Sequence, residues 1–268
     1  MGTEKNREEK QLILFSEGIM LTNRTKIILD ACGNHNGNMR MIEKMISYAK
    51  ESGADYIKFQ LFDADELNRD WENYEENYRY YSEIQLDANK VSRIINLANE
   101  VGIKVLFTAF SLNMARMLHS LGQKEVKIAS PDADNWELIL FCVLNFERVF
   151  VSTGMIDTKN LIRLKQLLRR NDVLFYCISK YPTKPQDIDY DKMALFDGFS
   201  DHTETIESSK KAIDLGIEWI ERHFTLGKFL PGRDHKLSST PDEIKDLCSH
   251  RDYVQKCEAY KVRWTNGN

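Results

Sequence analysis

The sequence predicts a (β/α)8 barrel, a single-domain α/β fold in which parallel strands alternate with helices. From residue 26 onward, short apolar runs rich in β-branched and aromatic residues alternate with segments whose apolar residues recur about every 3.6 positions. This alternation implies parallel pairing through right-handed crossovers. The eight strand candidates fit a closed barrel better than an open doubly wound sheet, and no GxGxxG motif follows the first of them.

The strand candidates are short apolar runs that end in polar residues. In chain order they are KIILDAC (26–32), DYIKFQ (55–60), KVLFTAF (104–110), EVKIAS (125–130), RVFVST (148–153), VLFYCIS (173–179), LFDGFSD (195–201) and EWIERHFT (218–225). Runs of this length, rich in Val, Ile, Phe and Tyr, are typical of buried strands.

The segments between the strands carry helix signals, namely an apolar stripe with a capping residue at its start or a glycine at its end. Helices are expected over residues 39–53, 87–102, 158–170, 203–216 and 241–260, with Gly53, Gly102 and Gly216 as stops, Asp157 or Thr158 as an N-cap and Pro241 in a first turn. Residues 61–85 are polar and aromatic, and we expect a long loop there.

The chain is expected to divide into four segments. Residues 1–11 would be a disordered tail and 12–25 an N-terminal hairpin that closes the bottom of the barrel. The barrel itself would occupy 26–260, followed by a second tail over 261–268.

Composition argues against several classes of partner. The net charge of −4 over 268 residues argues against bulk nucleic-acid binding, and a hydrophobic content of 42% suits a large buried core. No apolar run reaches the roughly 18 residues that span a bilayer. The five cysteines have no spacing pattern, as expected for reduced thiols. We therefore expect a cytoplasmic protein with neither nucleic acid nor membrane as a partner.

Polar side chains occur at nearly every strand end, and in a barrel these ends face one shared mouth. Lys58 and Lys127 lie inside apolar runs. A buried ammonium needs an anionic partner, so these two lysines predict a site for a phosphate or carboxylate. His202 and His223 follow the last two strand candidates. Two imidazoles from adjacent strands can share one metal ion and leave positions open for water and substrate.

Eight short motifs occur in order along the chain, each at the predicted mouth. They are NHNG (34–37), GADYIKFQ (53–60), KIAS (127–130), STGM (152–155), YPT (181–183), FSDHT (199–203), HFTL (223–226) and PGRDHKLS (231–238). Over about residues 26–245 the chain resembles the sialic acid synthase family, which condenses phosphoenolpyruvate with N-acylated hexosamines such as N-acetylmannosamine. The resemblance implies a (β/α)8 barrel, a homodimer and a divalent metal, with manganese first and magnesium or cobalt as alternatives.

The resemblance and the strand-end positions together give roles to individual residues. His202 and His223 would hold the metal and, with Asp30, Asp132 and Asp234, form the catalytic set. The substrate-binding candidates are Lys58, Gln60, Thr108, Lys127, Ser130, Ser152, Ser179, Tyr181, Ser200, Asn34 and His35. In the implied reaction C3 of phosphoenolpyruvate attacks the sugar aldehyde, water adds at C2, and phosphate leaves with C–O cleavage.

Several residues depart from the family's pattern. Asp30 and Asp132 stand where glutamate is usual, Cys32 replaces a glycine, Ala109 a proline and Ser179 an asparagine. Each aspartate is shorter by one methylene, roughly 1.5 Å of reach. Typical members also continue into a small antifreeze-like domain, and we expect the barrel part only. The open alternatives are a partner chain that supplies the missing lid, a different aldose or phosphosugar as acceptor, and a non-catalytic binding subunit.

Overall fold

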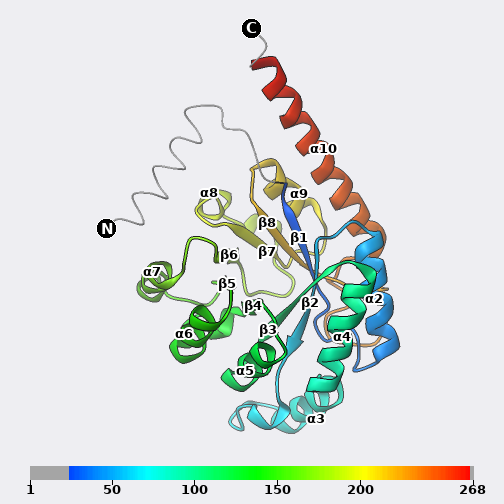
Figure 1. Ribbon diagram of the computed structural model, residues 1–268, viewed down its shortest axis with the longest axis vertical. Helices are drawn as coiled ribbons and strands as arrows, with labels where there is room; N and C mark the ends of the chain where they lie inside the picture. Colours follow the sequence, from blue (N-terminus) through cyan, green and yellow to red (C-terminus); the bar gives the residue numbers. More distant parts are fainter. Residues whose placement is uncertain (1–23, 266–268) are drawn as a thin grey trace.

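A computed structural model describes residues 24–265, and within them eight parallel strands close into a barrel in chain order (Figure 1). The strands are β1 (Lys26–Asp30), β2 (Tyr56–Leu61), β3 (Lys104–Ala109), β4 (Glu125–Ile128), β5 (Arg148–Ser152), β6 (Val173–Cys177), β7 (Gly198–Asp201) and β8 (Trp219–His223). β1 pairs with both β2 and β8, which closes the ring. The predicted (β/α)8 barrel is confirmed. Seven of the eight strand candidates contain the corresponding strand, and β2 extends one residue beyond its candidate, to Leu61.

Helices follow the strands and lie outside the barrel (Figure 1). They are α2 (Met39–Glu51), α3 (Tyr74–Ile84), α4 (Ala88–Val101), α5 (Leu112–Ser120), α6 (Trp136–Asn145), α7 (Thr158–Leu167), α8 (Tyr190–Met193), α9 (Glu207–Asp214) and α10 (Pro241–Thr265), with 3-10 turns η1 (Ala64–Glu66), η2 (Ser130–Asp132) and η3 (Pro185–Asp187). Asp157 is the N-cap of α7, since its side chain accepts from the backbone N–H of Asn160. No helix of the described part is long and apolar enough to cross a bilayer.

Alternate residues of each strand face opposite sides of the barrel wall. The outward side chains pack against the helices in one large apolar core that contains, for example, Leu29, Ile57 and Ile220. The inward side chains near the strand starts form a second, smaller cluster of Ile28, Tyr56, Leu106, Phe150, Val173, Phe175 and Trp219. This apolar plug fills the lower interior of the barrel and separates the polar groups at the carboxyl ends of the strands from those at the amino-terminal end.

The segment 61–85 is not the simple loop that we predicted. It contains the turn η1 and the helix α3, in which four tyrosines precede the buried Ile84. The rings of Tyr74 and Tyr78 lie 5.8 Å apart, Tyr81 packs against Phe62 at 4.8 Å, and the Arg233 guanidinium lies 4.1 Å from the Tyr80 ring centroid. The spacing of aliphatic residues does not indicate such a helix, because aromatic and cation–π contacts contribute to its packing.

The expected boundaries at the two ends of the chain compare differently with the structure. Helix α10 continues to Thr265, five residues beyond the predicted end of the barrel at 260. The expected tail over 1–11 and nearly all of the expected hairpin over 12–25 lie outside the described residues.

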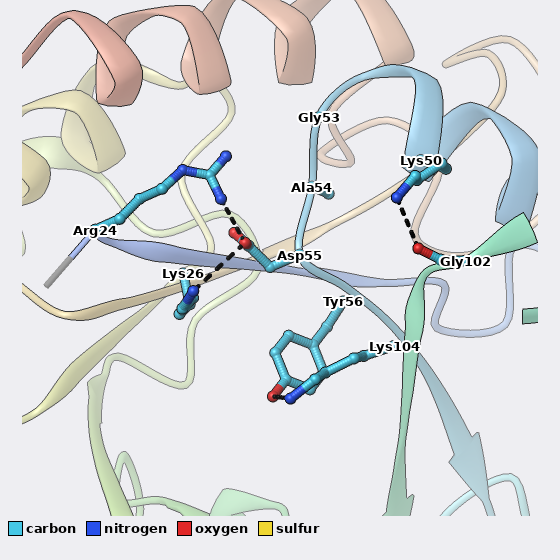
Figure 2. Close-up of a pocket in the computed structure, with 9 residues that line it drawn as sticks. All are labelled: Arg24, Lys26, Lys50, Gly53, Ala54, Asp55, Tyr56, Gly102 and Lys104. Carbon is cyan, nitrogen blue, oxygen red and sulfur yellow. Dashed lines mark hydrogen bonds and ion pairs between the residues drawn. The ribbon is translucent and has the colours of Figure 1, made fainter. Parts of the chain in front are cut away.

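A cavity of about 390 Å³ lies at the amino-terminal end of the barrel (Figure 2). Its lining includes Lys26, Tyr56 and Lys104, the first residues of three strands. The carboxylate of Asp55 binds Arg24 at 2.8 Å here, and Arg251 at 3.0 Å. This end is therefore occupied by structural ion pairs, and the polar strand ends lie at the other end of the barrel.

Candidate active site

Two lysines project into the barrel interior immediately above the apolar plug. Lys58 and Lys127 are both buried, and they lie on β2 and β4. The Lys58 ammonium donates to Asp30 Oδ2 at 2.7 Å and to Thr108 Oγ1 at 2.8 Å. The Lys127 ammonium contacts the two carboxylate oxygens of Glu221 at 2.9 and 3.1 Å. The predicted need for anionic partners is thus met by two carboxylates from β1 and β8.

Asp30 is held at the centre of this network by register. β1 places Asp30 opposite Lys58 on one side and opposite His223 on the other. Gln60 donates to Asp30 Oδ2 at 3.0 Å, and the Cys32 backbone N–H donates to Oδ1 at 3.0 Å. Burial opposes the charged carboxylate, but Lys58 and the other donors outweigh it and hold the pKa of Asp30 well below its usual value. Asp30 is therefore ionised at neutral pH.

Glu221 belongs to the same network, although the sequence analysis did not single it out. It accepts from Ser200 Oγ at 3.0 Å in addition to Lys127, and Lys58 lies 3.9 Å from its Oε2. Burial favours the neutral acid, yet the two lysines hold the pKa of Glu221 below its usual value. A signal was present in the sequence, because Glu221 precedes His223 by two residues and so faces the same side of β8.

The two histidines expected to bind metal lie side by side at the mouth. Their ring centroids are 5.2 Å apart, and the Tyr181 ring lies 4.4 Å from His202 and 5.7 Å from His223. His202 Nδ1 lies 2.9 Å from the carbonyl oxygen of Ile178. A carbonyl only accepts, so Nδ1 carries the proton and Nε2 keeps its lone pair for a ligand. The chain distance of 21 residues between these histidines is closed by the β7–β8 pairing.

The environment of His223 suits an ion. Its Nδ1 is buried and has no hydrogen-bond partner among the described residues. Burial, together with His202, lowers the pKa of His223 to about 3, and burial also lowers the pKa of His202. Both rings are therefore neutral at pH 7, which is the form that coordinates metal. Two neutral imidazoles beside a buried carboxylate fit a divalent cation.

Three serines follow or end the strands β4, β5 and β6. Ser130 Oγ lies 3.0 Å from Cys177 Sγ and accepts from the Gly154 backbone N–H at 3.1 Å. Ser152 is buried at the end of β5. The hydroxyl of Ser179 is buried and has no partner within residues 24–265. Hydroxyl groups of this kind can donate hydrogen bonds to an anion.

Asn34 and His35 hold the loop after β1 in place. The Asn34 amide donates to the Phe224 carbonyl oxygen and to Ser238 Oγ, both at 2.9 Å. His35 Nδ1 accepts from the Gly37 backbone N–H at 3.1 Å, and burial lowers the pKa of His35 to about 4. Both side chains therefore have structural contacts in addition to any contact with a sugar.

The two remaining aspartates differ in position. Burial, and then the charge of Asp30, raise the pKa of Asp234, so these carboxylates lie close enough to repel. The half-buried Asp132 stands apart in η2, where its carboxylate interacts with Asn135 and Asp134. Burial raises the pKa of Asp132 to about 6. The structure thus brings Asp234 to the network, whereas the described contacts of Asp132 are local.

Known proteins resemble this chain along most of its length. The model of the NeuB family matches residues 45–262. An N,N'-diacetyllegionaminic acid synthase of Campylobacter jejuni is 32% identical over 257 residues, covering 87% of this chain and 77% of that protein. A protein of the same description from Legionella pneumophila is 34% identical over 248 residues, covering 82% and 69%.

The fold has a close counterpart among solved structures. An N-acetylneuraminic acid synthetase from Leptospira borgpetersenii, determined in complex with citrate, superposes with a TM-score of 0.81 at 24% identity. The superposition covers 91% of this chain and 92% of that one. At this identity the likeness supports the barrel fold alone.

Proposed function

Because the chain belongs to the NeuB family, we propose that it condenses phosphoenolpyruvate with an N-acyl hexosamine to form a sialic-acid-like nonulosonic acid and releases phosphate. The observation that carries this proposal is the convergence of two functions on one mouth. Two buried ammonium groups form its anion side, and two neutral, adjacent imidazoles form its metal side. Phosphoenolpyruvate, a small molecule with a phosphate and a carboxylate, suits the first, and an aldehyde that needs polarisation suits the second.

The lysines can bind a further anion without losing their present partners. Each ammonium has three N–H donors. Lys58 directs two of them to Asp30 and Thr108, and its remaining contact, with Glu221 Oε2 at 3.9 Å, is too long for a hydrogen bond. Lys127 directs two donors at most to Glu221 and likewise has one left. Ser130, Ser152 and Ser200 would add hydroxyl donors around the phosphate. Glu221 holds Lys127 and Ser200 in position, which makes it a positioning residue.

His202 and His223 would hold a divalent ion, for which we propose manganese, with magnesium or cobalt as alternatives. Such an ion supplies Lewis acidity to an aldehyde oxygen. The remaining steps fall to the chain's own residues and to water. The bond between C3 of phosphoenolpyruvate and the aldehyde carbon forms, the aldehyde oxygen takes a proton, water adds at C2, and the C2–O bond to phosphate breaks.

The carboxylates would manage charge and protons during these steps. Asp30 is ionised beside Lys58 and His223 and would stabilise positive charge that develops at C2. Burial, and then the charge of Asp30, raise the pKa of Asp234, and this carboxyl group would exchange a proton with the sugar. Asp132 stays a proposed catalytic residue, with a pKa of about 6 that suits an acid or base.

A second candidate keeps phosphoenolpyruvate and changes the acceptor to another aldose or a phosphosugar. The shorter Asp30 favours it, because this side chain is already fixed by Lys58, Gln60 and the Cys32 amide and reaches less far into the mouth. A panel of acceptors separates the two candidates. N-acyl hexosamines alone should support turnover under the first, and other aldehydes or phosphosugars under the second.

The test is release of phosphate from phosphoenolpyruvate in the presence of manganese and each sugar. Wild-type protein should release phosphate with at least one N-acyl hexosamine, and His202→Ala should not. His250→Ala is a matched control, because His250 pairs with Asp214 on the surface at 2.8 Å. If no acceptor supports phosphate release, the proposal is wrong, and a non-catalytic binding subunit is the alternative that remains. A homodimer or a lid-supplying partner is part of the proposal, and light scattering should give twice the chain mass for the former.

A further inference from the structure

Cys32 occupies an unusual position at the mouth. It follows β1 by two residues, it is buried, and its backbone has a φ of 47°. This left-handed conformation is disfavoured for residues with a Cβ and easy for glycine. A side chain at such a position carries a cost in stability, and strain of this kind concentrates at functional sites.

Cys32 is also close to two groups that can bind metal. One ligand atom each of Asp30, Cys32 and His223 lie within 4.8 Å of one another, and all three residues are buried. The closeness of Asp30 and His223 follows from the β1–β8 register, in which they are opposite. His223 is 8% exposed, and its Nδ1 has no hydrogen-bond partner in the described part of the chain. A buried, unpartnered imidazole nitrogen beside a thiol and a carboxylate is a donor set that suits a cation.

We propose that Cys32 is a ligand of the divalent ion, together with the carboxylate of Asp30 and a ring nitrogen of His223. The inference rests on the proposed function, since it concerns the same ion. Three protein ligands leave room in the coordination sphere for water or substrate, as catalytic sites require. A thiolate is a soft ligand, so the site would bind cobalt, zinc or iron(II) more tightly than manganese or magnesium.

The existing contacts of Asp30 and Cys32 leave room for this role. Asp30 accepts three hydrogen bonds, from Lys58, Gln60 and the Cys32 amide. An ionised carboxylate has about four acceptor positions, so one is left for a metal. The Cys32 thiol lies 3.5 Å from the Asp30 carbonyl oxygen, a weak contact that coordination would replace. His202, with its ring centroid 5.2 Å from that of His223, lies beside the set and can complete it.

The test is a cobalt(II) titration of the metal-free, full-length protein, followed by absorption spectroscopy. A Cys32–cobalt bond gives a thiolate-to-cobalt charge-transfer band in the near ultraviolet. The variant Cys32→Gly should lose this band, and its cobalt and zinc affinities should fall at least about tenfold, the lower end for groups that support metal ligands. Its manganese affinity should change less than its cobalt affinity. Cys142→Ala is the matched control, because Cys142 is buried in α6 away from the mouth, and it should keep the band.

The variant Cys32→Gly is expected to fold, because glycine adopts the φ of 47° without strain. If the wild type binds cobalt without a charge-transfer band, Cys32 is not a ligand. The histidine site of the proposed function is then unaffected. A band that persists in Cys32→Gly has the same consequence. Failure to bind cobalt at all also overturns the inference. Phosphate release with manganese tests the proposed function separately, so the two failures can be told apart.

Discussion

Lys127 and Glu221 form a buried ion pair across the barrel interior, with the ammonium 2.9 and 3.1 Å from the two carboxylate oxygens. The partners come from β4 and β8, which are not neighbours in the barrel, so the contact spans its interior. The Lys127 ammonium also lies 4.5 Å from the Phe175 ring centroid, at the top of the apolar plug. This pair fixes the position of the lysine proposed to bind phosphoenolpyruvate.

Replacing Glu221 by Gln should destabilise the protein by about 3–5 kcal/mol, the usual cost of leaving one partner of a buried ion pair alone. Urea unfolding of the wild type and the variant measures it. The double variant Glu221→Gln/Lys127→Met should recover part of the loss, because it removes the unpaired charge. A loss below about 1 kcal/mol would mean that the pair is not buried as described.

Binding of manganese should stabilise the wild type and not the variant His223→Ala. A ligand that binds only the folded state at one hundred times its Kd adds about 2.7 kcal/mol to the unfolding free energy. Thermal or urea unfolding with and without manganese measures this increment. His250→Ala should keep the full increment. An equal increment in His223→Ala would place the ion elsewhere.

Stability should fall as the pH is lowered from about 6.5 to 4, in part because of His35. Burial, with a contribution from Lys90, lowers its folded pKa to about 4, whereas the unfolded imidazole has a pKa near 6.5. In this window the unfolded state binds a proton that the folded state does not, so the stabilisation is complete above pH 6.5 and is lost toward pH 4. Each such histidine contributes up to about 1.4 kcal/mol per pH unit.

The comparison of wild type with His35→Asn isolates this contribution, since Asn can still accept from the Gly37 amide. The slope of unfolding free energy against pH should be shallower in the variant between pH 6.5 and 4. Asp132, with a pKa raised to about 6, acts in the opposite direction in both proteins and cancels in the difference. Equal slopes would show that His35 is protonated in the folded protein.

Asp201 should prove structural, although it lies between Ser200 and His202. Its carboxylate binds Arg222 Nη1 at 2.5 Å on the outer side of the barrel wall, and both side chains are buried. Asp201→Asn should therefore cost about 3 kcal/mol in unfolding free energy. The KM for phosphoenolpyruvate, measured on folded protein, should stay near the wild-type value. A large rise in KM with little loss of stability would move Asp201 into the site.

Much of the site followed from residue type and strand alternation. It could be predicted that Lys58 and Lys127 have negatively charged partners, because a charged side chain flanked by apolar residues in a buried strand needs one. His202 and His223 could be paired because adjacent parallel strands end at the same edge. Glu221 was missed because it lies inside β8 and not at the strand end, although its spacing of two residues from His223 puts both on the same side of the strand. Helix α3 was missed because tyrosines make up most of its apolar residues and Ile84 alone is buried in it.

The sequence by itself determined the alternation of strands and helices, the closed barrel, and the residue types that gather at its mouth. These are local properties, since hydrophobic period and strand-end polarity are read over short windows. Only the tertiary structure decided which charges neutralise one another, namely Lys58 with Asp30 and Lys127 with Glu221. It also placed Cys32 beside His223. Such pairings depend on barrel register and on the direction of side chains from distant strands. A shift of a few ångströms decides whether a side chain contacts its partner.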